Sequence, residues 1–287
     1  MLRDAETIYA EILRRQPNDF DTLHLLGVIA DAQWNKSVCV LQLGRFRPGW
    51  AQYEWRRRLD PPLTGRTCSQ PLWLGKAEVA GKTVFLHWEQ GFGDTIQFCR
   101  YARLVQALGA EVVMSVQDAM FPLLRQMEPE IRIIGETPEP AAFDTHCPLM
   151  SLPLAMGTTL KTIPSGARYL AADARLRVDW AERLPATTKP RIGLVRRGRA
   201  SHRNDRNLSM ELAALLPLLR DDAEWICLQH EITAEEATLL KQDGRTTFIG
   251  GDVRDFSDTA ALVDRMEPII TVDTSVAHLA GATGKPV

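Results

Sequence analysis

The chain has 287 residues, 45% of them hydrophobic and 24% charged, and its formal net charge is −2 at pH 7. This length allows roughly two domains, and the near-neutral charge excludes a global electrostatic attraction to nucleic acid or to acidic lipid. The five cysteines include no CxxC pair, which argues against a disulfide framework and offers no ligand spacing typical of a zinc site.

The N-terminal sequence MLRDAETIYAEILRRQP is charged and amphipathic, and it lacks the apolar core of a secretory signal peptide. No apolar stretch in the chain reaches the length that spans a bilayer. The cysteine usage fits a reducing compartment. We therefore expect a cytoplasmic protein, which could still act on a membrane-bound acceptor.

Residues 1–62 predict a short α-helical segment. Small and aromatic residues recur there at helix-packing spacing, each set followed by a proline: Ala5, Tyr9, Ile12 and Pro17, then Gly44, Phe46, Gly49, Tyr53 and Pro61. This resembles the tetratricopeptide (TPR) pattern, in which small residues let paired helices approach closely. The register of roughly 34 residues is broken, so residues 20–43 predict one merged helix. An unrelated helical hairpin is the alternative.

TPR-like helices bind peptides or pack on a neighbouring domain. About one and a half repeats are too few for an independent solenoid, so we expect this segment to dock onto the domain C-terminal to it. A peptide is the second expected partner. Residues 63–80 predict a linker, because the sequence TGRTCSQPLWLG is polar and rich in turn-forming residues.

Strands and helices alternate from residue 81 onward, which predicts an α/β fold with parallel sheets. In residues 81–184, the runs VFLHW, EVVMSV and IRIIG predict strands, and residues 94–108 and 118–127 predict helices. FDTHCPLMSLPLAMG predicts a further strand end and a short helix. The prolines of PATTKPRIG predict a connection between two halves.

The same alternation restarts in residues 190–287. RIGLV, WICLQ and PIITVD predict strands, and residues 208–219, 233–241, 258–266 and 275–283 predict helices. The fold class we predict is therefore two Rossmann-like halves behind a short helical segment, with a ligand between the halves at the carboxyl ends of the strands. Because the chain stops at GKPV, where another strand is expected, we expect the second half to be incomplete.

The stretch EQGFGDT follows the first predicted strand and opens a helix. It is not the dinucleotide fingerprint, since Ile96 occupies the third glycine position. Gly91 and Gly93 let a substrate approach the backbone, and Gln90 belongs to the same loop. Asp94 either caps the helix or acts as a general base. A helix N-terminus lowers a carboxylate pKa, so we expect Asp94 to be ionised.

Two stretches of the second half suit a diphosphate. The first is RIGLVRRGRASHRNDRNLS, a strand and the basic loop after it, which hold six arginines: Arg191, Arg196, Arg197, Arg199, Arg203 and Arg206. Such a loop can clamp phosphates, although a solvated face or a nucleic-acid patch are alternatives, the latter without a supporting motif. The second is Asp273-Thr274-Ser275, where a strand ends and a helix begins, with His278 one turn further. An ordinary N-cap is the alternative there.

The stretches EQGFGDTIQFCRY, SHRNDRNLS, DFSDTAALV and VDTSVAHLAGATGKPV, taken in this order, resemble bacterial TPR proteins with a GT-B glycosyltransferase domain similar to ADP-heptose lipopolysaccharide heptosyltransferases. The resemblance implies a nucleotide-sugar donor held by Arg206, Asp273, Thr274, Ser275 and His278, and a glycan or protein acceptor. It also implies Asp94 as the base of an inverting transfer that needs no cofactor and no metal. The one DxD spelling, Asp19-Phe20-Asp21, lies in the helical segment, in keeping with a metal-independent transfer.

Two alternatives to an active transferase stay open. One is a non-catalytic protein that combines helices for a peptide partner with a vestigial sugar-nucleotide domain, or a degenerate fragment. The other is a sugar-nucleotide epimerase of the same two-domain build, which would change the donor without an acceptor.

Overall fold

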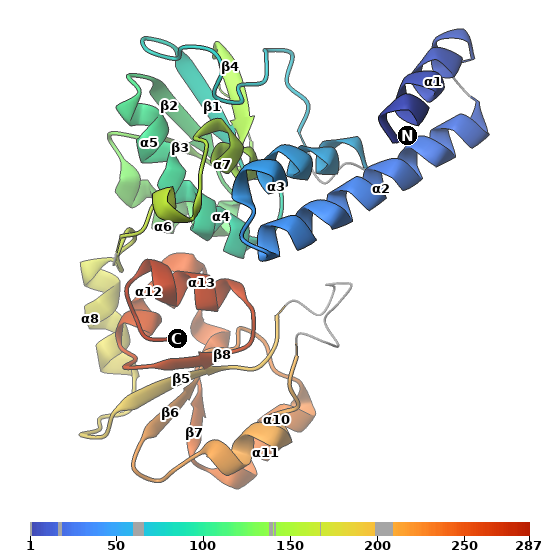
Figure 1. The fold of residues 1–287 in the computed structure, drawn as a ribbon. Coiled ribbons are helices and arrows are strands. Elements are labelled where there is room, and N and C mark those ends of the chain that lie inside the picture. Colours follow the sequence, from blue (N-terminus) through green and yellow to red (C-terminus); the bar gives the residue numbers. More distant parts are fainter. Residues whose placement is uncertain are drawn as a thin grey trace.

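The computed structural model describes residues 2–16, 19–59, 66–137, 140, 142–166, 168–198 and 209–287. Two parallel sheets, each with helices, come after a helical segment at the N-terminal end of the chain (Figure 1). This confirms the predicted α/β class. None of the described helices is both long and apolar enough to cross a membrane.

The two sheets have the same strand order. The first is β3-β2-β1-β4, with β1 Thr83–His87, β2 Glu111–Ser115, β3 Arg132–Ile134 and β4 Thr145–Pro148. The second is β7-β6-β5-β8, with β5 Arg191–Val195, β6 Glu224–Cys227, β7 Thr246–Phe248 and β8 Ile269–Thr271. Apolar runs predicted β1, β2, β3, β5, β6 and β8, whereas β7 was missed because its three residues are half-buried and form no apolar run.

The helices of the two halves alternate with these strands. They are α4 Phe92–Phe98, α5 Ala102–Ala107, α6 Phe121–Leu124, α7 Leu152–Ala155, α8 Ala174–Arg183, α10 Leu212–Leu215, α11 Ala234–Asp243, α12 Phe256–Asp264 and α13 Ser275–Ala282. Helix α8 was not predicted, since Trp180 is its one buried residue and no apolar stripe marks it.

The single helix predicted for residues 94–108 is divided by a 3₁₀ turn, η2 Cys99–Tyr101. Cys99 and Tyr101 are both buried. Residues two apart are separated by about 160° around an α-helix but by about 120° around a 3₁₀ helix. The tighter turn therefore brings both side chains nearer to one face, toward the core.

The N-terminal helices are α1 Leu2–Arg15, α2 Phe20–Gln42, α3 Phe46–Tyr53 and the 3₁₀ helix η1 Glu54–Arg58. Helix α2 confirms the single helix predicted for residues 20–43, and Asp19 caps it by accepting the Thr22 N–H at 2.9 Å. A Cβ on Gly49 would lie 2.6 Å from Leu41 Cδ2, so glycine lets α3 approach α2 closely. The TPR assignment itself stays a prediction.

The helical segment docks onto the first half, as expected from its length. Helix α3 packs against α7, and the Trp50 ring meets Phe98 of α4 edge-on with centroids 6.4 Å apart. The predicted linker is also packed from residue 66 onward: Leu72 forms a parallel bridge to His146, and Trp73 is buried. Both segments therefore stabilise the sheet that carries the loop before α4.

The two halves share one continuous core. Helices α12 and α13 of the second half lie directly beneath the first half in Figure 1. Phe92 of α4 packs on Phe256 of α12 at 4.9 Å between centroids, and Trp180 Nε1 donates to Asp258 at 3.0 Å. Apolar packing thus holds the halves against each other, and the Trp180 bond fixes α8, which lies between them in the chain, to α12.

Gly75 provides a test of this packing. It has a positive φ of 82°, and a Cβ there would collide with the carbonyl group of Ala155 in α7. Gly81 has a similar φ of 71°, but nothing lies within 4 Å of its Cβ position. Gly81→Ala therefore tests the left-handed backbone alone and should cost about 1 kcal/mol of unfolding free energy. Gly75→Ala should cost about 1–3 kcal/mol more through the collision, as measured by urea denaturation. Equal losses in the two variants would contradict the packing at Ala155.

Candidate functional site

The two halves meet where α4 follows β1 and α13 follows β8. A Cβ on Gly93 would lie 2.7 Å from His278 Cδ2, so only a glycine lets the start of α4 approach α13 this closely without displacing the ring. The prediction gave Gly93 to a substrate. In the structure its missing side chain serves the contact between the halves, and the role toward a substrate stays a prediction.

Asp94 stands at this junction and is half-buried. Its Oδ2 accepts the N–H of Gly91 at 2.9 Å, which is the capping role that the sequence left open. Burial raises the pKa of Asp94 above the ordinary value, and the N–H of Gly91 and the nearby His278 only partly offset this. The expectation of a lowered pKa is therefore wrong, because desolvation outweighs the helix N-terminus.

The start of α13 carries no side-chain cap among the described residues. Thr274 occupies the N-cap position, yet among the described residues its side chain makes no capping hydrogen bond and its Oγ1 lies 3.1 Å from Thr271 Oγ1. Ser275 is the first residue of the helix. Without a side-chain cap, the first N–H groups and the helix dipole favour an anion.

Asp273 and His278 flank this helix start. The Asp273 side chain is largely exposed, and its Oδ1 lies 4.0 Å from His278 Nε2. Both side chains lie close enough to Asp94 to influence its charge state. The structure thus brings together Asp94, Gly93 and the second-half residues Asp273, Thr274, Ser275 and His278, as the sequence predicted, although their chemical roles stay predictions.

The basic loop is only partly a candidate for phosphate binding. Arg196 and Arg197 both form ion pairs with Glu236 of α11, the second at 3.5 Å, and Arg191 donates to the Pro185 carbonyl at 2.8 Å. These three arginines are directed at the protein rather than at a ligand. Arg206, the residue predicted to face the donor, lies outside the described residues together with Arg199 and Arg203.

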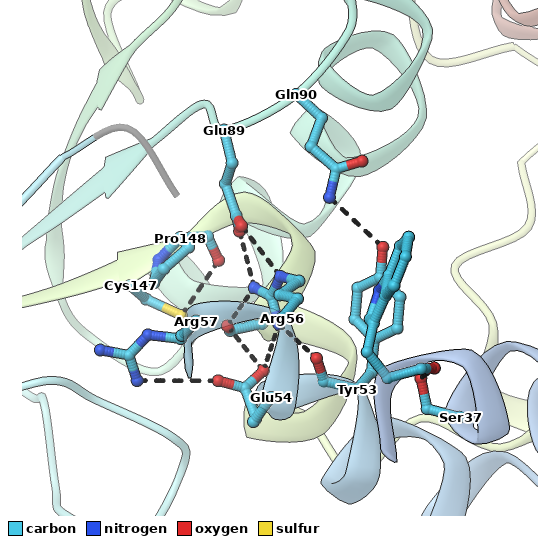
Figure 2. A network of polar contacts seen from close by, with 11 residues as sticks. Ser37, Tyr53, Glu54, Arg56, Arg57, Glu89, Gln90, Cys147 and Pro148 are labelled. Carbon is cyan, nitrogen blue, oxygen red and sulfur yellow. Dashed lines mark hydrogen bonds and ion pairs between the residues drawn. The ribbon is translucent and has the colours of Figure 1, made fainter. Parts of the chain in front are cut away.

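Gln90 lies on the side of the loop that faces the helical segment. Its Nε2 donates to the Tyr53 hydroxyl at 3.4 Å (Figure 2). Its backbone carbonyl accepts Gln117 Nε2 at 3.1 Å. Gly91 is the exposed N-cap of α4. The predicted acceptor role of these two residues is untested, but the observed contacts of Gln90 hold the loop in place.

A buried ion pair next to this loop was not foreseen from the sequence. Arg56 of η1 donates two hydrogen bonds to Glu89, at 2.9 and 2.7 Å, and neither side chain has any solvent exposure (Figure 2). Arg56 also binds Glu54 at 2.8 Å and Ser151 at 2.7 Å. Burial acts to lower the pKa of Arg56, but the carboxylates of Glu89 and Glu54 outweigh it, so the pKa is raised and the arginine stays charged.

Through Arg56, this network joins the helical segment to Glu89, in the loop before α4, and to Ser151, directly before α7. In the sequence, Arg56 lies in the run WRRRLD, which is typical of a solvated surface, and no local pattern identifies Glu89 as its partner. The pair is therefore a feature that positions the loop, found from the fold alone.

Two hollows lined by described residues lie away from Asp94. One, of about 350 Å³, is formed by α8 with Arg265, and the other, of about 10 Å³, lies between β5, β6 and α11 near Glu236. Residues 199–208, which come after β5 in the chain, lie outside the described residues.

No family model matches the chain. In sequence it is similar to Protein FlbA of Caulobacter vibrioides, with 23% identity over 286 residues that cover 90% of this chain and 48% of FlbA. The chain thus spans about half the length of this curated relative.

In structure the chain is similar to glycosyltransferases. One is TibC, a bacterial iron-containing dodecameric glycosyltransferase from enterotoxigenic E. coli H10407, with a TM-score of 0.54 and 14% identity over 74% of this chain and 58% of TibC. Another is the E. coli ADP-heptose LPS heptosyltransferase II, with a TM-score of 0.50 and 14% identity over 70% of this chain and 82% of that protein. At identities this low, the structural similarity shows the fold alone. It supports the predicted GT-B-like arrangement of two parallel sheets.

Proposed function

We propose that this protein transfers a sugar from a nucleotide-sugar donor to an acceptor hydroxyl, with inversion at the anomeric carbon and without a metal. The observation that carries the proposal is the junction of α4 and α13. There a carboxylate from one half, Asp94, stands beside an uncapped helix start from the other, Thr274 and Ser275. Transfer chemistry needs both a base and an anion site, and the two lie at one place.

In the proposed reaction, Asp94 accepts the proton of the acceptor hydroxyl. The hydroxyl oxygen forms a bond to the anomeric carbon while the bond from that carbon to the diphosphate breaks, and the diphosphate leaves with the electron pair. The N–H groups at the start of α13 stabilise the leaving charge. Arg206 is assigned to the same task by the family resemblance alone.

His278 and Asp273, the two charged neighbours of Asp94, have separate roles in the proposed reaction. His278 sits beside the donor site, where its ring also fills the space over Gly93. Asp273 flanks the phosphate-binding segment, and its carboxylate acts to raise the pKa of Asp94 further, after burial. A raised pKa makes Asp94 a stronger base once it is ionised, which suits proton abstraction from a hydroxyl.

The first test of the proposal is whether the protein binds a nucleotide-sugar donor. TibC has been solved in complex with ADP-D-β-D-heptose, and heptosyltransferase II is named for ADP-heptose, so ADP-sugars are the first candidates. Calorimetry with ADP-sugars and UDP-sugars should show saturable binding of one series, followed by donor hydrolysis or transfer in a coupled assay. Absence of binding to both series would reject the proposal, and binding without any turnover of the donor would favour the non-catalytic alternative.

A further inference from the structure

Three potential metal ligands from distant parts of the chain meet on one face of the first sheet. Cys68 lies in the packed segment before Leu72, His87 ends β1, and His146 lies in β4. One ligand atom from each residue lies within 4.8 Å of the other two. This cluster shares no residue with the proposed glycosyl-transfer site.

The two imidazoles are buried against each other. His87 is 1% exposed and His146 is 5% exposed, and their rings are stacked with centroids 5.3 Å apart. His87 Nε2 and His146 Nδ1 are hydrogen-bonded to each other at 3.1 Å, a separation close to the roughly 3.3 Å between two nitrogens on a tetrahedral zinc ion. A zinc ion would therefore take the place of the proton that the two rings share, with little change in the distance between them.

His87 also carries an unused polar atom. Its Nδ1 is buried and has no partner with hydrogen-bond geometry among the described residues, although the Trp88 backbone acts on this ring. A metal ion on Nε2 would leave Nδ1 to carry the N–H of the ring, so the ion would replace the contact between the two imidazoles and not a bond at Nδ1.

Two nearby arginines oppose a cation at the cluster, although each has a partner of its own. Arg57 and Arg66 both act on His87, but Arg57 is paired with Glu54 at 3.8 Å and Arg66 donates to the Glu136 carbonyl at 2.6 Å. Both guanidinium groups are thus engaged with other partners. Deprotonation of the Cys68 thiol on metal binding supplies a negative charge within the cluster itself.

We infer that Cys68, His87 and His146 bind one zinc ion, with the fourth tetrahedral position left to water or another ligand. One thiolate and two imidazoles form a ligand set that zinc prefers over harder cations. The ion would tie residues 66–73 to the adjacent strands β1 and β4. Residues 66–73 lie between the N-terminal helices and β1 in the chain. The bound ion would therefore help to hold the N-terminal helices on the first sheet.

The test is metal binding by the full chain after chelator treatment. Equilibrium dialysis against ZnCl₂ should give one zinc per chain, and Co²⁺ should give a thiolate-to-cobalt charge-transfer absorption in the near ultraviolet. Cys68→Ser and His146→Asn should each weaken binding at least about 10-fold, while Cys39→Ser, a change at an exposed cysteine of α2, should leave binding unchanged. The zinc-dependent rise in Tm should be lost together with binding.

Two results would overturn the inference. One is a folded wild-type chain, checked by circular dichroism, that binds no stoichiometric zinc. The other is zinc binding that Cys68→Ser and Cys39→Ser affect equally, which would place the ion elsewhere. Should Cys68→Ser fail to fold, the cobalt absorption of the wild-type chain decides whether a thiolate is a ligand, and His146→Asn decides whether the imidazole pair is.

Discussion

Replacing Asp94 by asparagine is expected to lower turnover by about 10²–10⁴-fold, the usual contribution of a general base. Asparagine has no basic oxygen that can take up the proton of the acceptor hydroxyl. Donor binding should be preserved, because the proposed phosphate site at the start of α13 keeps Thr274 and Ser275. The measurement pairs steady-state transfer rates with calorimetric donor affinity in the same preparations.

The substitution is suited to this purpose because it keeps the cap of α4. Asparagine retains a side-chain oxygen that accepts the N–H of Gly91, so the helix start should be unchanged. Asp222→Asn is the matched control, since Asp222 is exposed and pairs with its neighbour Arg220. Full activity in the Asp94 variant would remove this residue from the mechanism, and a parallel loss of donor affinity would make its role structural.

The pH profile supplies an independent readout of the same residue. Burial raises the pKa of Asp94 above the ordinary 3.8, and the base must be ionised to act. Therefore kcat/KM should fall as the pH drops through the raised pKa, with the acid limb above pH 3.8. The same limb should be absent from the residual activity of the Asp94→Asn variant. An acid limb that survives the substitution would belong to another group.

Replacing Arg56 by methionine is expected to lower the unfolding free energy by about 3–5 kcal/mol. The change leaves the Glu89 carboxylate buried without its partner and removes the hydrogen bond to Ser151. Since the pair joins the helical segment to the loop before α4, the loss should appear as a lower urea midpoint with an unchanged m-value.

A double-mutant cycle separates the ion pair from the packing around it. Arg56→Met combined with Glu89→Met should recover part of the loss, because no uncompensated charge stays buried. Arg14→Met is the control: Arg14 pairs with Glu11 on the exposed surface of α1, and this change should have little effect. A small loss in Arg56→Met alone, comparable to that of the surface control, would show that the pair does not hold the segments together.

The sequence determined the elements whose signals are local. Buried strands such as β1 and β5 consist mostly of consecutive apolar residues. In the helices between the strands, apolar residues instead recur about every 3.6 residues, and this difference distinguishes the two. Helix starts with a capping residue, such as Asp19 before α2 and Thr233 before α11, are likewise specified within four residues. From these signals alone the α/β class, the two halves and the position of Asp94 at the opening of a helix could be derived.

The tertiary structure alone decided which side chains meet and how much water reaches them. Arg56 and Glu89 are 33 residues apart, and His87 and His146 are 59 residues apart, so no local pattern links either pair. The pKa of Asp94 is raised, although the local sequence predicted that it would be lowered. The stretch EQGFGDT indicates the helix start, but the desolvation of Asp94 depends on the packing of both halves. Local propensity is a short-range property of the chain, but burial and pairing are set by contacts between segments that only the folded molecule brings together.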